Sequence, residues 1–162
     1  MSENEGKLFN VGEDQRRRLI RMDSGKVNIA PPTAAAKWFK IVGVRLGNGT
    51  PDYPHGDEVQ TIEPWGPPDL WKGLGTVTLN AILTEIDQGM PNGRLYSDHP
   101  QATDRGAWQV VQKHLPDLNE AQAREIIRTW VKNGVLYLVD YHDEQDRKDR
   151  KGLRVNDRKR PG

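Results

Sequence analysis

The chain contains no cysteine among its 162 residues. Disulfide bonds, thiolate nucleophiles and zinc sites built on cysteine are therefore excluded. It also has no apolar run near the roughly 18 residues that cross a bilayer. Residues 1–10 are polar and acidic, unlike a secretory signal peptide. We therefore expect a soluble, cytoplasmic protein with no membrane partner.

The chain is also poor in apolar residues. Hydrophobic residues make up 35% of it and charged residues 29%, so part of it should be solvated tail or loop. Its length suits one ordinary domain or two small ones. The net charge of +1 is too small to indicate a nucleic-acid ligand, so the distribution of charge must decide that question.

Residues 1–25 contain three consecutive arginines and little apolar periodicity. This composition predicts a flexible N-terminal arm. The alternative is a basic arm that lies on phosphates.

Residues 26–64 are typical of a small β region. Residues 26–32 alternate apolar and polar positions before a Pro-Pro pair, which indicates a short edge strand. Residues 36–46 are rich in β-branched and aromatic side chains and end at a Gly-Asn-Gly turn. Residues 58–63 alternate again. We predict a hairpin that pairs residues 36–46 with residues 58–63.

Residues 65–75 are rich in proline and glycine and cannot hold a regular element. We predict a linker here, between two halves of the chain. Trp65 and Trp71 would be its buried anchors, because exposed tryptophans in a free linker are unusual.

The second half shows helical periodicity. Apolar residues spaced i, i+3, i+4, i+7 predict a first helix, capped by Thr76 or Thr78 and ended by Gly89. They are Leu79, Ile82, Leu83 and Ile86. A short strand is expected at residues 94–96.

Two more helices follow. Thr103 is the expected cap of the second, which stops at Pro116; its apolar side chains are Ala107, Trp108, Val111 and Leu115. Asn119, with Gln122 three residues on, predicts a capping box at the start of the third helix, and Gly134 its left-handed end. The apolar face of the third helix comprises Ala123, Ile126, Ile127, Trp130 and Val131.

The C-terminal part is β-prone. Residues 135–141 and 152–156 predict a hairpin, and the charged segment between them a mobile tip. The order helix, short strand, helix, helix, hairpin is typical of a winged helix that contains a helix-turn-helix. The predicted fold class is α+β: a small antiparallel sheet, then a winged-helix domain at residues 76–156 and a basic tail at residues 157–162.

The third predicted helix has a basic stripe. Arg124, Arg128 and Lys132 are spaced i, i+4, i+8 opposite its apolar face. In a helix-turn-helix this face enters the major groove and meets phosphates or guanine edges. The alternative is a solvated face that Glu120 and Glu125 partly neutralise. Trp108 and Trp130 are expected in the core rather than as stacking platforms.

The basic tail could add phosphate contacts. The complete set of predicted nucleic-acid-binding residues is Arg124, Arg128, Lys132, Lys151, Arg154, Arg158, Lys159 and Arg160.

Motifs for catalysis are absent from the sequence. It has no G-x-x-x-x-G-K-[ST], no G-x-S-x-G and no H-E-x-x-H, and its four histidines are scattered. We therefore expect no enzymatic activity, no metal and no cofactor.

Several segments resemble one family. The segments DSGKVNIAPP (23–32), KWFK (37–40), VRLGNG (44–49) and residues 59–65 resemble the region after the nucleotide-binding core of RepA-type, RecA-like ATPases. These AAA-family proteins occur in phages, prophages and plasmids, in a class that includes replicative helicases. Residues 105–133 and 152–155 match the winged-helix-like segment that follows in the family.

The resemblance implies the C-terminal region of such an ATPase. No Walker motif is present, so the ATPase activity is not carried over. Residues 26–63 would extend a RecA-like sheet. Without that sheet they leave an exposed edge, from which we expect self-association or binding to a RecA-like core.

Two functions follow as hypotheses. The first is a DNA-binding accessory domain of a replication ATPase, with little sequence preference. The second is a protein-interaction module, with an exposed apolar patch around Trp65 and Trp71. An enzyme with an unrecognised site is a third and weaker alternative.

Overall fold

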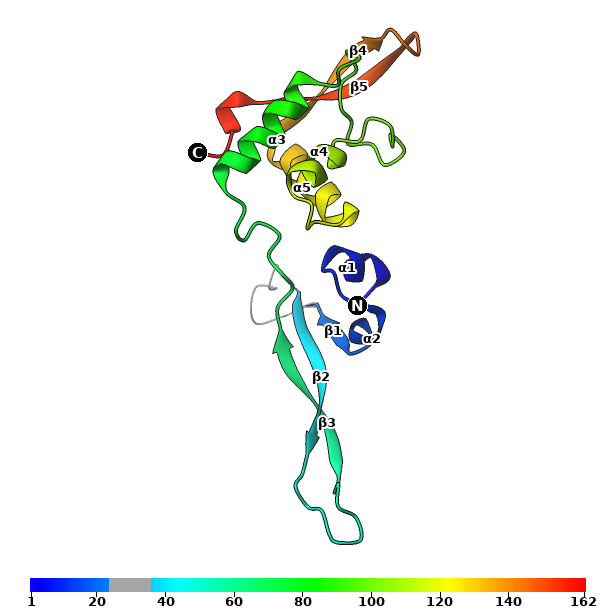
Figure 1. Ribbon diagram of the computed structural model, residues 1–162, viewed down its shortest axis with the longest axis vertical. Helices are drawn as coiled ribbons and strands as arrows, with labels where there is room; N and C mark the ends of the chain where they lie inside the picture. The colour runs from blue at the N-terminus through cyan, green and yellow to red at the C-terminus, as the bar shows by residue number, and fades with distance from the viewer. Residues whose placement is uncertain (24–35) are drawn as a thin grey trace, which may run out of the picture. The chain divides into compact units, whose positions relative to one another are not determined.

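The computed structural model describes residues 1–23 and 36–162, which divide into two compact units, Met1–Pro68 (unit 1) and Asp69–Gly162 (unit 2). The described residues form a mixed α+β structure of five α-helices and two small antiparallel sheets (Figure 1). The strand predicted at residues 26–32 lies outside the described residues.

Unit 1 contains a three-stranded sheet of β1 (Leu19–Met22), β2 (Lys37–Arg45) and β3 (Glu58–Trp65), in that order. The predicted hairpin is confirmed: β2 and β3 are antiparallel, with Trp38 opposite Trp65 at one end. Among the residues that the structure describes, β1 pairs with residues 37–40 of β2, and the rest of the hairpin is a two-stranded ribbon. Figure 1 shows this ribbon extending away from α1 and α2.

The N-terminal arm is not structureless, and that prediction is wrong for residues 3–22. They form α1 (Glu3–Leu8), α2 (Glu13–Arg16) and β1. The Ser2 hydroxyl accepts the Glu5 backbone N–H, and the Glu5 carboxylate accepts the Ser2 backbone N–H in return. These elements have four to six residues, too few for apolar periodicity to reveal them.

Unit 1 has a small aromatic cluster at the base of the hairpin. Phe9, Trp38 and Trp65 meet edge to face, with centroids about 6 Å apart. Trp65 therefore ends β3 and is not a linker residue. Among the described residues of unit 1, the buried large apolar side chains are those of Leu19 and Trp38.

Unit 2 contains α3 (Thr76–Gln88), α4 (Trp108–His114) and α5 (Glu120–Asn133). The apolar face predicted for α3 is buried, but its cap is Gly75, with no side-chain hydrogen bond, so the threonine caps are wrong. α4 begins after Ala107, later than the predicted start at Thr103. Backbone hydrogen bonds from Ser97 to Arg105 and from Ala107 to Ser97 hold the intervening residues outside the helix.

The signals for α5 are confirmed. Asn119 and Gln122 form the predicted capping box, and Gly134 ends the helix with φ 71°. Ile126 and Trp130 of α5 join residues from all three helices and the following hairpin in one core. Its members are Leu79, Ile82, Leu83, Ile86, Ala107, Val110, Val111, Ala123, Ile126, Ile127, Trp130, Leu136, Leu153 and Val155.

The C-terminal hairpin consists of β4 (Leu136–Asp143) and β5 (Lys148–Val155), both longer than predicted. The strand predicted at residues 94–96 does not form. Instead, the Leu153 N–H donates to the Tyr96 carbonyl, and Ser97 makes a single bridge with Gly106. A short 3₁₀ turn, η1 (Asp157–Lys159), lies within the predicted basic tail.

Candidate nucleic-acid interface

The outer face of α5 presents two of the predicted site residues to solvent. Ile126 and Trp130 are buried on the inner face of the helix. Arg128 and Lys132, one turn apart, are exposed on the outer face. Arg128 pairs only with Glu125 of the same helix, while Lys132 forms no ion pair with any described residue. Both head groups are therefore open to an anionic ligand.

Arg124 does not continue this stripe. Its guanidinium lies over the Trp108 ring, 5.0 Å from the centroid. Its Nε donates to Glu120 Oε1 at 2.7 Å, and its Nη2 donates to the Pro100 carbonyl at 3.4 Å. The Arg124 side chain is only 21% exposed. The sequence spacing is correct, but the aromatic neighbour at Trp108 draws the guanidinium inward.

Two of the tail residues predicted to bind phosphates instead bind other parts of unit 2. Lys159 Nζ donates to the Asn133 carbonyl at 2.9 Å, at the end of α5. Arg160 binds Asp157 and reaches α3 at Asn80 and Thr84. The Lys159 contact satisfies a carbonyl that the end of α5 leaves free, whereas the helix partners of Arg160 lie within α3.

Arg154 has a similar internal role. It donates to the Asp87 carbonyl of α3, and the Asp87 carboxylate accepts the Val155 backbone N–H at 2.9 Å. By contrast, Lys151 and Arg158 are exposed or nearly so. Of the eight predicted residues, Arg128, Lys132, Lys151 and Arg158 are exposed with side chains that bind no other described element, whereas Lys159 is exposed but hydrogen-bonded to the end of α5.

An ion-pair network that the sequence did not reveal holds the tip of the β4–β5 hairpin. Arg94 donates to Asp143 at 2.8 Å and also pairs with Asp104 and Asp146. Arg150 pairs with Asp143 and Asp146 from the other strand. Residues 144–149 of the tip are exposed, while Asp143, Asp146 and Arg150 at its base form these ion pairs.

Asp143 is the centre of this network, with 1% of its surface exposed. Burial alone would raise the pKa of Asp143, but hydrogen bonds from the Asp146 backbone N–H and from Arg94 outweigh it and lower the pKa. The carboxylate therefore stays charged and fixes the tip to the segment around Arg94. Its position at the end of the β-prone run was the only sequence signal.

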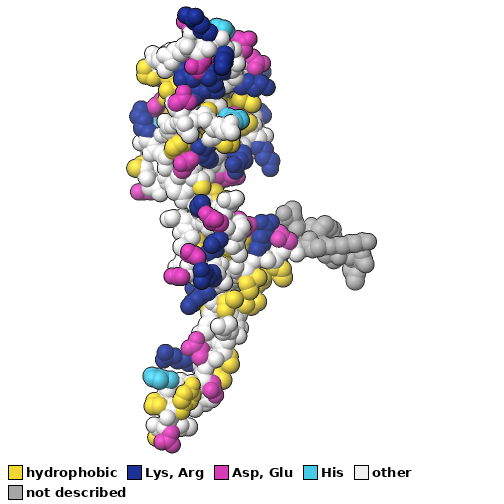
Figure 2. Space-filling model, turned by 90° about the vertical axis from the view of Figure 1, so that its right-hand side faces the viewer, with side chains coloured by type: hydrophobic (Ala, Val, Ile, Leu, Met, Phe, Trp, Pro, Cys, Tyr) yellow, Lys and Arg dark blue, Asp and Glu magenta, His cyan; other side chains and the backbone are white. Residues whose placement is uncertain are grey.

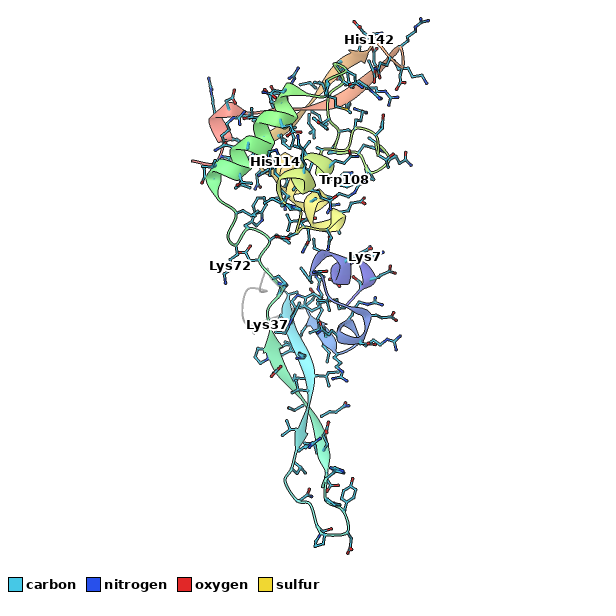
Figure 3. All side chains as sticks on the ribbon, in the orientation of Figure 1. Lys7, Lys37, Lys72, Trp108, His114 and His142 are labelled. Carbon is cyan, nitrogen blue, oxygen red and sulfur yellow. The ribbon has the colours of Figure 1, made fainter. Side chains whose placement is uncertain are left out.

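A pocket of about 330 Å³ opens beside α5. Trp108 and Arg124 form one wall, and Ile127 and Val131 contribute apolar surface. Trp108 was predicted in the core, but it is only partly buried at the core's edge (Figure 3). Trp130 is buried as predicted and meets Trp71.

A second polar cluster joins α3 to α4. Glu85 accepts from Lys113 Nζ at 2.8 Å and contacts His114 Nε2 at 2.9 Å. The hydrogen bond from Lys113 lowers the pKa of Glu85 more than burial raises it. Figure 3 shows His114 and His142 at different places in unit 2. Within residues 1–23 and 36–162, no group of three His, Asp or Glu side chains could hold a metal ion.

Comparison of the chain with known protein families, curated proteins and solved structures finds no significant match. None of the helices in the described parts of the chain has both the length and the apolar character needed to cross a membrane.

Proposed function

We propose that unit 2 is a winged-helix domain that binds nucleic acid. The order α3, α4, α5, β4, β5 supports this arrangement, because α4 and α5 are joined by a short turn and a hairpin follows. The hydrogen bond from the Leu153 N–H to the Tyr96 carbonyl also supports it, because it places the segment around Tyr96 beside β5.

The outer face of α5 is the observation that supports binding most strongly. A helix whose opposite face is fully packed presents Arg128 and Lys132 together, without an acidic partner from another element. In a helix-turn-helix the second helix presents its exposed face to DNA. Two cations at this spacing suit phosphates of one backbone, and the charge on each is available without breaking the fold.

The contact area should be small. Unit 2 has fifteen Lys and Arg against fourteen Asp and Glu, so it has no broad basic surface. Lys159 holds η1 against the end of α5, which adds the neighbouring Arg158 to the same region as Lys132. We infer about four phosphate contacts at most, and therefore a modest salt dependence with little sequence preference.

The test is DNA binding by the full chain, measured by fluorescence anisotropy across a salt series. Replacing Arg128 and Lys132 together by alanine should weaken duplex binding and reduce the slope of log K against log salt by about two. The control variant K7A/R17A removes the same charge from two exposed residues of unit 1, one in α1 and one directly after α2. If R128A/K132A and the control bind equally well, α5 is not the contact surface.

A second candidate function rests on unit 1. The β2–β3 hairpin exposes Val44, Leu46, Val59 and Ile62, each 44% or more accessible. Figure 2 shows hydrophobic side chains along this hairpin. Exposed apolar rows of this kind mark surfaces that bind protein. The patch expected around Trp65 and Trp71 is not where the exposed apolar side chains lie, because each tryptophan packs against other aromatic rings.

The resemblance to RepA-type ATPases suggests a RecA-like core as a partner for this hairpin. We propose that a RecA-like core, or a second copy of the chain, covers it, so that unit 1 connects the nucleic-acid-binding unit to a larger assembly. Light scattering after size-exclusion chromatography tests the self-association part: a monomer at all concentrations would leave the separate core as the proposed partner.

A further inference from the structure

One wall of the pocket beside α5 is a guanidinium layered over an aromatic ring. The Arg124 guanidinium lies over the Trp108 ring. Glu120 and the Pro100 carbonyl hold that guanidinium in place. A wall of this kind attracts flat, electron-rich rings, because bases stack on both aromatic rings and guanidinium planes. It is set in advance by contacts within the protein, so a ligand would not have to order it.

The rest of the pocket selects for size and polarity. Ile127 and Val131 supply apolar surface on the α5 side, which does not suit a phosphate group. The volume of about 330 Å³ is at the lower end of the range for small-molecule sites. A single flat ring system fits within this volume.

Two charged residues with opposite roles complete the pocket. Asp98 is exposed and forms no ion pair with any described residue, so its carboxylate can accept hydrogen bonds from amino groups. Arg128 reaches the same pocket from the outer face of α5, with 70% of its side chain exposed. A nucleotide matches both, since its base can offer an amino group to Asp98 while its phosphate pairs with Arg128.

We propose that this pocket holds a single unpaired nucleobase with an exocyclic amino group, stacked against the Trp108–Arg124 wall. This inference rests on the proposed function and makes it more specific. The preferred ligand is a nucleic acid with an unpaired base, in a bulge or single strand, and not a continuous duplex. Thymine, which has no exocyclic amino group, is a poorer occupant than cytosine.

The test uses the full chain and four DNA duplexes that differ at one position: fully paired, with a bulged cytosine, with a bulged thymine, and with a bulged abasic site. The cytosine bulge should bind about tenfold more tightly than the paired duplex, as one base–aromatic stack allows. The abasic bulge should bind like the paired duplex. It controls for the flexibility that a bulge adds to DNA.

Two variants assign the preference to the pocket. Val131→Phe narrows the pocket and should remove the preference for the cytosine bulge without weakening binding to paired DNA. Asp98→Ala should make the cytosine and thymine bulges equal, whereas Asp140→Ala, the control on exposed β4, should leave them different. Circular dichroism checks that each variant is folded.

The outcomes separate the two proposals. Equal binding of paired and bulged DNA by the unaltered chain overturns the base pocket and leaves the DNA-binding function intact; the pocket would then suit a protein side chain. A cytosine preference that survives Val131→Phe also overturns the pocket assignment. No binding to any of the four DNAs contradicts both proposals.

Discussion

The two units of the chain differ in how much apolar surface they bury. Unit 2 joins fourteen buried residues from three helices and a hairpin in one core. Unit 1, over its described residues, buries the large apolar side chains of Leu19 and Trp38 and exposes others, among them Val44, Val59 and Ile62, on a two-stranded ribbon. A ribbon of two strands is at best marginally stable in water. From this contrast we expect unit 2 to fold by itself, and we propose that a partner covers unit 1.

The largest effect is expected when the two units are produced as separate chains and their thermal unfolding is compared. Residues 69–162 alone should unfold in one cooperative transition, because their core is complete. Residues 1–68 alone should show no cooperative transition, because the buried apolar area is too small to offset the loss of conformational entropy. Circular dichroism during thermal unfolding measures both. A sharp transition for residues 1–68 would show that unit 1 needs no partner.

Matched isoleucine truncations sharpen the contrast within the full chain. Ile126 in α5 has no exposed surface, whereas Ile62 in β3 is 54% exposed. Ile126→Ala should destabilise unit 2 by about 2–5 kcal/mol, since it leaves a cavity. Ile62→Ala should change stability by no more than about 0.5 kcal/mol. Urea unfolding gives both values. A large loss from Ile62→Ala would mean that the β3 side chain is already covered, for example in a dimer.

A smaller effect concerns pH in unit 1. Hydrogen bonds from the Ser2 backbone N–H and hydroxyl, and then from Arg21, lower the pKa of Glu5 to about 2. A lowered pKa means that Glu5 contributes stability above its unfolded value near 4.5 and loses that contribution as the pH falls toward 2.

The carboxyl resonance of Glu5, followed by NMR from pH 6 to pH 2, gives this pKa directly. Glu5→Gln should abolish the acid-sensitive part of the stability of α1. In unit 2, Asp143 should also titrate below its usual range, because Arg94 and backbone N–H groups bind it. A midpoint for Glu5 at or above 4.5 would contradict the capping geometry.

The sequence predicted unit 2 better than unit 1 for a physical reason. α3 and α5 have complete apolar faces, and Asn119 and Gly134 mark the ends of α5, so local rules and tertiary packing agree. In unit 1 the helices are too short for periodicity, and Phe9 packs against Trp38 of β2, a contact that spacing along the chain does not reveal.

The candidate site was predictable only in part. Spacing along α5 correctly placed Arg128 and Lys132 on the outer face. It could not show that Trp108 draws Arg124 inward, that Lys159 binds the end of α5, or that Arg160 binds α3. Those contacts join residues far apart in the chain, and positive charge alone does not distinguish a phosphate ligand from a backbone carbonyl.

The most direct test of the account is the salt dependence of duplex binding by unit 2 alone. Residues 69–162 should bind DNA with a slope of log K against log salt that corresponds to about four phosphates, and R128A/K132A should reduce that slope by about two. Binding whose affinity does not change with salt would contradict the claim that the outer face of α5 contacts the nucleic-acid backbone. An unchanged slope in R128A/K132A would contradict it as well.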